Sequence, residues 1–168
     1  MNNVILIGYM GCGKSTVGVR LSYTLQQPFL DTDKLIEKKQ GRTIPEIFAE
    51  DGEEVFRQME TDCVRDLTSE KKWYVIATGG GLPMRKINRK ILKELGIVVY
   101  LRIRPETVYE RLKEDTGRPL LQGENPMMKI ESMIKERGPK YESCANVIID
   151  VDGKSFEEIL SEIEEAVK

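Results

Sequence analysis

The sequence predicts an α/β fold in which a parallel sheet has helices on both faces. Short, continuous apolar runs, typical of buried parallel strands, alternate along the chain with amphipathic stretches of helical period. A glycine-rich turn at residues 8–15 stands between the first apolar run and the first amphipathic stretch. At about 150 residues per domain, the 168 residues are expected to form a single domain.

Five strands and a set of intervening helices follow from this alternation. The expected strands are residues 4–7, 28–30, 73–77, 97–101 and 147–149. Two of the expected helices begin at residues 14 and 105. The others are expected at residues 34–39, 44–67, 87–95, 127–137 and 156–167, and the helix at 44–67 is broken near residues 51–52. We expect Gly96 to cap the end of the helix before it, and Gly138-Pro139 to end a helix at Arg137.

The composition excludes several classes of chemistry. The chain has no histidine, which excludes Ser-His-Asp and histidine–metal sites and leaves carboxylates or lysines as bases. Its three widely spaced cysteines suit a reducing compartment, so we expect a cytoplasmic protein without a cysteine zinc site. A net charge of −2 argues against nucleic-acid binding, and no apolar run is long enough for a membrane span.

The turn at residues 8–15, Gly-Tyr-Met-Gly-Cys-Gly-Lys-Ser, fits the phosphate-binding pattern G-x-x-x-x-G-K-[ST]. Its glycines let backbone N–H groups converge on a polyphosphate, Lys14 can reach the β- and γ-phosphates, and Ser15 can ligate Mg²⁺. The helix expected after it adds a positive N-terminal end. The pattern predicts a nucleotide and Mg²⁺ but leaves hydrolysis, motor activity and small-molecule phosphorylation open.

Two further groups follow expected strands. Asp31 and Asp33 end the second strand, and Gly79, Gly80 and Gly81 follow the third. In an open parallel sheet, ligands bind beyond the carboxyl ends of the strands, which suggests a site here. Ordinary turns remain an alternative for both groups.

Three arginines are candidates for holding an anion, because a guanidinium offers a planar fork of donors. Taken alone, Arg57 is better explained as a solvated partner of Glu60, and Arg137 as a cation at a helix end. Arg118 lies in the polar segment at about 115–126, which is long enough to suggest a mobile lid.

Taken together, these motifs resemble the shikimate kinase family over essentially the whole chain. The matching segments are the P-loop with Thr16, Asp31-Thr32-Asp33, 41–48, 52–57, 79–81, 118–121 and Arg137. The resemblance implies a three-layer P-loop NTPase fold with five parallel strands, a substrate-binding region at about 34–67 and a lid at about 115–126. It implies ATP-dependent phosphorylation of shikimate at its 3-hydroxyl, toward chorismate and the aromatic amino acids.

The resemblance also assigns roles to individual residues. The implied catalytic residues are Lys14, Asp33 and Arg118. The implied nucleotide contacts are Gly11, Cys12, Gly13, Lys14, Ser15, Thr16, Arg111, Arg118 and Lys154. The implied shikimate contacts are Asp33, Arg57, Gly79, Gly80, Gly81 and Arg137. The implied Mg²⁺ partners are Ser15 and Asp31. We expect a monomer that uses ATP and Mg²⁺ and binds neither nucleic acid nor membrane.

Two alternatives stay open. Another small-molecule kinase of the same architecture, such as a gluconate kinase, would share the P-loop, the lid and a need for arginines. A nucleotide-dependent switch or motor is disfavoured, because the sequence lacks the N-K-x-D motif that a GTPase uses for guanine.

Overall fold

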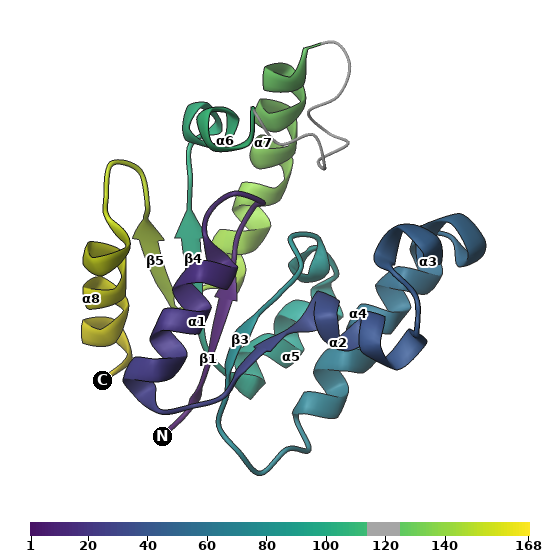
Figure 1. The fold of residues 1–168 in the computed structure, drawn as a ribbon, viewed down its shortest axis with the longest axis horizontal. Helices are drawn as coiled ribbons and strands as arrows, with labels where there is room; N and C mark the ends of the chain where they lie inside the picture. Colours follow the sequence, from purple (N-terminus) through teal and green to yellow (C-terminus); the bar gives the residue numbers. More distant parts are fainter. Residues whose placement is uncertain (114–124) are drawn as a thin grey trace.

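The computed structural model describes residues 1–113 and 125–168 (Figure 1). Its five strands are all parallel and lie in the order β2-β3-β1-β4-β5. The strands are β1 Asn3–Ile7, β2 Phe29–Asp31, β3 Val75–Ala77, β4 Gly96–Arg102 and β5 Val147–Asp150. The predicted α/β class and the five predicted strands are confirmed.

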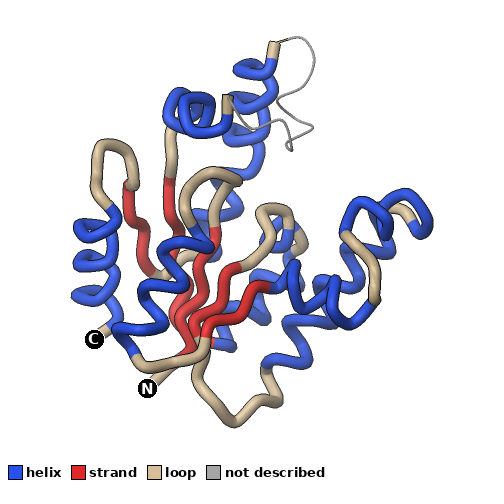
Figure 2. Tube along the Cα trace, in the orientation of Figure 1, coloured by secondary structure: helices blue, strands red, loops and turns tan. Residues whose placement is uncertain are grey.

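Helices cover both faces of the sheet, which forms the centre of the molecule (Figure 2). Helices α1 and α8 lie on one face, while α5 and α7 pack on the other and α4 lies along α5 (Figure 1). The α-helices are α1 Lys14–Leu25, α2 Thr32–Gln40, α3 Ile44–Asp51, α4 Glu53–Leu67, α5 Lys86–Leu95, α6 Pro105–Leu112, α7 Pro126–Cys144 and α8 Phe156–Val167. A short 3-10 turn, η1, spans Leu82–Met84.

The hydrophobic residues form a main core and a smaller one. The main core surrounds the central strands, and every residue of β1 is buried. A second cluster, made by Ile36, Ile47 and Phe56, joins α2, α3 and α4. The region expected to bind substrate therefore has a hydrophobic cluster of its own beside the main sheet.

The fold confirms one expectation about helix ends and corrects another. Gly96 caps the end of α5, since its amide donates to the Leu92 carbonyl, although its backbone is extended, with φ of 172°, and it is also the first residue of β4. Glycine is needed there because an added Cβ would collide with the backbone of Asn3. Helix α7 does not end at Arg137 but continues through Pro139 to Cys144. Burial of Tyr141 and Cys144 in the main core favours the continued helix despite the proline.

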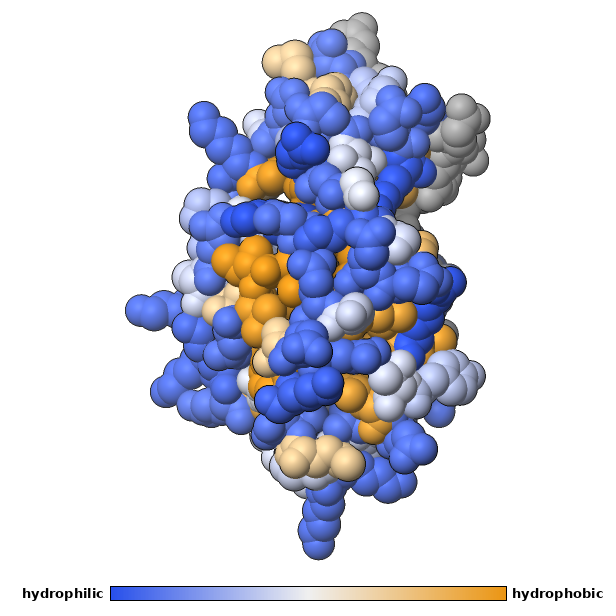
Figure 3. Space-filling view, turned by 90° about the vertical axis from the view of Figure 1, so that its left-hand side faces the viewer, coloured by the Kyte–Doolittle hydropathy of each residue, from blue (hydrophilic) through white to orange (hydrophobic). Residues whose placement is uncertain are grey.

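The side of the molecule that carries β5 and α8 is mostly hydrophilic, with an apolar area among charged residues (Figure 3). Strand β5 is an edge strand of only four residues. Its Asp150 forms an ion pair with Arg102 of the neighbouring strand, and short, charged edges of this kind discourage pairing with another sheet. In the described part of the chain, no helix is both long and apolar enough to cross a membrane.

Candidate active site

The phosphate loop joins β1 to α1 at the carboxyl edge of the sheet. Gly11 and Gly13 have φ of 81° and 97°, a left-handed conformation that favours glycine. Lys14 Nζ donates hydrogen bonds to the carbonyls of Gly8 at 2.5 Å and Tyr9 at 3.2 Å. No side chain of the described residues caps the N-terminus of α1, so its first amide groups are left without a side-chain partner. These amides and the positive end of the helix dipole are available to a phosphate in the cleft.

A cleft of about 1000 Å³ lies in front of this loop. It is bounded by the phosphate loop, the ends of β2 and β3, the start of α3 and residues of α6 and α8. The predicted site residues that line it are Gly11, Gly13, Lys14, Ser15, Thr16, Asp31, Asp33, Gly79, Gly80 and Arg111. The cleft also brings Phe156 close to the loop, since a Cβ on Gly13 would lie 3.3 Å from its ring. Sequence reasoning missed Phe156 as a site residue and placed it only at the start of the last expected helix, 156–167.

The two aspartates after β2 do different things. Asp31 caps α2, accepting hydrogen bonds at Oδ1 from the amides of Asp33 at 2.9 Å and Lys34 at 3.3 Å. Asp33 points toward the glycine loop after β3, residues 79–81, where a Cβ on Gly79 would lie 2.6 Å from its Oδ1. Burial raises the pKa of the Asp33 carboxyl and Asp31 adds to this, whereas Lys14 and Arg57 lower it. The pKa of Asp33 therefore responds to charges of the phosphate loop and of α4.

The glycine loop provides space for charged side chains. A Cβ on Gly80 would lie 3.3 Å from Arg137 Nη1, and one on Gly81 would overlap the guanidinium of Arg57. None of the three glycines has a positive φ, so space rather than backbone conformation requires them. The loop is also anchored, because the Gly79 amide donates to Thr32 Oγ1 at 3.1 Å. A merely flexible turn does not explain these contacts.

Arg57 and Glu60 form a buried ion pair on α4. Arg57 Nη1 lies 2.7 Å from Glu60 Oε1, and the Glu60 side chain is only 1% exposed. Burial raises the pKa of Glu60 to about 7, although the hydrogen bond and charge of Arg57 oppose this. The expected pair exists, but the expectation that it is solvated was wrong. Glu60 was missed as a site residue, although its spacing places it on the buried stripe of Phe56, Val64 and Leu67.

Arg137 reaches the same place from the middle of α7. Its guanidinium lies 5.9 Å from the centre of the Tyr9 ring, in the range of a cation–π contact. One turn further along α7, Tyr141 donates a hydrogen bond from its hydroxyl to the Gly80 carbonyl at 2.6 Å. The structure thus brings Asp33, Arg57 and Arg137 around one glycine loop.

The expected nucleotide contacts are placed less uniformly. Arg111 donates to the Gly11 carbonyl at 2.7 Å and lines the cleft. Lys154 instead pairs with Glu162 at 2.8 Å and is absent from the cleft lining. The Cys12 side chain is fully buried beneath the loop, which leaves only its backbone for the cleft. Arg118 and most of the expected lid, residues 114–124, lie outside the described residues.

The residues expected to hold Mg²⁺, Ser15 and Asp31, both line the cleft. Among the described residues, no group of three or more potential ligands from His, Cys, Asp and Glu gathers at one point. One hydroxyl and one carboxylate beside a phosphate loop fit Mg²⁺, which usually keeps waters and takes substrate phosphates as further ligands.

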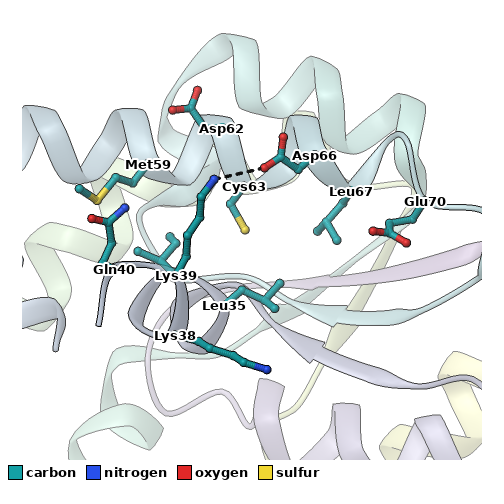
Figure 4. A pocket seen from close by; sticks show the side chains of 11 residues that line it. Leu35, Lys38, Lys39, Gln40, Met59, Asp62, Cys63, Asp66, Leu67 and Glu70 are labelled. Atoms are coloured by element: carbon teal, nitrogen blue, oxygen red, sulfur yellow. Dashed lines mark ion pairs between the residues drawn. The ribbon is translucent and has the colours of Figure 1, made fainter. Parts of the chain in front are cut away.

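A second hollow of about 480 Å³ lies between α2 and α4 (Figure 4). Met59, Cys63 and Leu35 supply apolar walls, and a Lys39–Asp66 ion pair of 3.6 Å spans its rim. None of the phosphate-loop or glycine-loop residues lines it. We therefore place the candidate active site in the larger cleft, where the polar groups converge.

The fold and the cleft define the class of the protein as a P-loop phosphotransferase that acts on a small molecule. The family model described as shikimate kinase matches residues 10–168. The shikimate kinase of Moorella thermoacetica is 44% identical over 166 residues, which cover 99% of this chain and 94% of that protein. That of Thioalkalivibrio sulfidiphilus is 44% identical over 162 residues, 96% of this chain and 85% of the relative. The chain belongs to the shikimate kinase family.

Solved structures agree with this placement. Shikimate kinase from Acinetobacter baumannii, in complex with shikimate, superposes with a TM-score of 0.91 at 42% identity, covering 99% of this chain and 93% of that one. The Aquifex aeolicus enzyme gives a TM-score of 0.85 at 36% identity, with coverage of 98% and 95%. A gluconokinase from Sinorhizobium meliloti, at 18% identity, 99% and 91% coverage and a TM-score of 0.61, shares the fold alone.

Proposed function

We propose that this chain carries out the reaction of its family, transfer of the γ-phosphoryl group of ATP to the 3-hydroxyl of shikimate in aromatic amino acid biosynthesis. The observation that carries the assignment of residues is their convergence. Asp33, Arg137 and Arg57 lie beside Gly79, Gly80 and Gly81 respectively, and Asp33 lines the same cleft as Lys14 of the phosphate loop. Groups that can bind a carboxylate therefore surround a loop next to the group that binds phosphate.

On the nucleotide side, the amides of Gly11, Cys12 and Gly13 and of the first turn of α1 bind the phosphates. Lys14 offsets charge on the β- and γ-phosphates, and Thr16 and Arg111 contribute to nucleotide binding. Ser15 and Asp31 would hold Mg²⁺, which supplies further charge neutralisation when bound. Arg118, and Lys154 on the adenine side, stay predictions from the family resemblance.

On the acceptor side, Arg57 and Arg137 bind the shikimate carboxylate from two helices, each as a fork of donors. The glycine loop lets the ring approach the backbone and offers amide groups to its hydroxyls. Asp33 accepts a hydrogen bond from the reacting hydroxyl and orients it toward the γ-phosphate. Its burial supports a second role as proton acceptor, since a raised pKa brings a carboxylate closer to the working pH of a base.

These roles suit phosphoryl transfer, which depends on positioning and on charge neutralisation rather than on covalent catalysis. Lys14 compensates charge at the phosphates while Asp33 places the hydroxyl in line with the bond that breaks. Closure of the cleft over the reactants would favour transfer to the alcohol over transfer to water.

We further propose a cytoplasmic monomer. All three cysteines are free thiols, as is usual in a reducing compartment. The short, charged edge strand β5 supports a monomer.

A coupled assay of ADP release tests the function. Wild-type protein with ATP and Mg²⁺ should release ADP at least about 100-fold faster with shikimate than with gluconate or with no acceptor, because the arginines and Asp33 position one acceptor. The Lys14→Ala variant serves as the background. Equal rates with all three additions would refute the proposal.

A further inference from the structure

Tyr141 joins α7 to the glycine loop. Its side chain is 1% exposed, and its hydroxyl donates a hydrogen bond of 2.6 Å to the carbonyl of Gly80. Because a peptide unit is planar, holding this carbonyl also fixes the direction of the Gly81 N–H group. The preceding peptide unit is held independently, since the Leu82 amide donates to the Gly79 carbonyl at 3.1 Å. Both amides that the loop can offer to a ligand thus have set directions.

The Arg137 guanidinium lies beside the same part of the loop. A Cβ on Gly80 would lie 3.3 Å from Arg137 Nη1 and 3.8 Å from Tyr141 Oη, which places both groups next to Gly80. The hydroxyl proton is directed to Gly80, so the oxygen keeps lone pairs that can accept from a donor such as the guanidinium. Burial raises the pKa of Tyr141, and the positive charge of Arg137 opposes this.

Arg137 is held from a second direction as well. The Tyr9 ring of the phosphate loop lies 5.9 Å from its guanidinium carbon, and the Tyr9 hydroxyl in turn contacts Met133 of α7 at 3.5 Å. A free arginine side chain loses rotamer entropy when it is immobilised. A guanidinium already oriented by its surroundings has less of that freedom left to lose on binding an anion.

We propose that Tyr141 is a positioning residue for the acceptor. Its hydroxyl sets the Arg137 guanidinium and the Gly80–Gly81 peptide unit in the relative arrangement that binds the carboxylate and a hydroxyl of shikimate. This inference rests on the proposed roles of Arg137 and the glycine loop. Tyr141 itself contacts the loop next to the arginine, and it takes no part in the transfer of the phosphoryl group.

The Tyr141→Phe variant tests this, because it removes the hydroxyl and keeps the ring. We expect the dissociation constant for shikimate, measured by isothermal titration calorimetry, to rise about tenfold, as for loss of one hydrogen bond to a charged group. KM for ATP should change less than about twofold, since the phosphate loop keeps its own contacts.

Tyr100→Phe is the matched control. Tyr100 is also buried, on β4, and its ring packs on that of Tyr141 with centroids 5.0 Å apart, but Tyr100 lines a separate hollow with Arg102 and Glu142. The Tyr100→Phe variant should keep the dissociation constant for shikimate within about twofold of wild type. If both variants weaken shikimate and ATP binding equally, in step with a lower melting temperature, the hydroxyl has only a structural role and the proposal is wrong.

A double-variant cycle identifies the route of the effect. Adding Tyr141→Phe to Arg137→Ala should lower kcat/KM for shikimate by less than it does in the wild-type background, because one of the two groups that Tyr141 positions is already gone. A loss as large as in the wild-type background would overturn the proposal. If wild-type protein and Tyr100→Phe both fail to phosphorylate shikimate, the proposed function fails, which is a distinct result from an unchanged Tyr141→Phe.

Discussion

Arg57 and Glu60 lie one turn apart on α4 and form an ion pair of 2.7 Å in which the glutamate is almost completely buried. A buried carboxylate is stabilised by its partner but loses its hydration, and here burial is the larger effect on its pKa. The pair therefore titrates near neutral pH and holds Arg57 beside Gly81, where the proposed acceptor site lies.

Glu60 should make the stability of the protein depend on pH. Its pKa is about 7 in the folded protein against 4.5 as the ordinary value, so between these pH values only the folded state holds the proton. Stability should therefore fall as pH rises through this window, by about 3 kcal/mol in total. Glu60→Gln should lack this slope. Chemical denaturation of both proteins at pH 5 and pH 8 measures the difference, and parallel pH dependences would contradict the prediction.

Arg57→Ala should act mainly on the acceptor. Losing a charge-assisted hydrogen bond costs about 1.5–3 kcal/mol of binding free energy. KM for shikimate should therefore rise by about 10-fold or more, while KM for ATP stays within about twofold. Steady-state kinetics with each substrate varied in turn gives both values. Arg85→Ala is the control, because Arg85 pairs with another glutamate of α4, Glu54, at 2.9 Å, whereas the guanidinium that lies against Gly81 is that of Arg57. An equal change in both KM values for Arg57→Ala would count against the assignment.

Gly79→Ala should damage catalysis more than folding. The new Cβ would lie 2.6 Å from Asp33 Oδ1 and 3.2 Å from Glu60 Oε2, so the flexible carboxylates must move while the backbone can stay. We expect kcat to fall at least about tenfold and the melting temperature by less than about 4 °C. Gly138→Ala is the matched control, since no described atom lies within 4 Å of a Cβ there. Full activity of Gly79→Ala would show that the position of Asp33 is not critical.

Asp33→Asn keeps the shape of the side chain and removes its charge. We expect turnover to fall by about 100-fold or more, because an amide orients the hydroxyl poorly and cannot accept its proton. In the wild-type protein, kcat should rise with pH up to a pKa above the ordinary aspartate value, and this limb should be absent from the variant. Asp62→Asn is the control, because Asp62 is an exposed residue of α4 that lines the hollow between α2 and α4 and not the cleft. Stopped-time measurements of phosphorylated product from pH 4.5 to 8 distinguish these cases, and retention of wild-type turnover would exclude Asp33 as the orienting group.

Local patterns in the sequence were sufficient for the strands, the phosphate loop and most helices. Apolar runs and glycine spacing are set by short-range geometry, and β1 with the turn into α1 follows from them directly. The family resemblance supplied Arg57, Arg137 and the glycine loop as candidates. From their own neighbourhoods in the sequence, both arginines were better explained as surface or helix-end cations.

Long-range packing decided the rest. Arg137 stands in the middle of α7 because burial of Tyr141 and Cys144 outweighs the effect of Pro139 before them, a balance that no local pattern contains. Glu60 is buried because α4 places the Arg57–Glu60 pair against the glycine loop that follows β3. Sequence alone thus determined which groups the chain has for phosphoryl transfer, because phosphate binding is built from consecutive residues. Only the tertiary structure determined which charges meet, because the acceptor site is assembled from elements far apart in the chain.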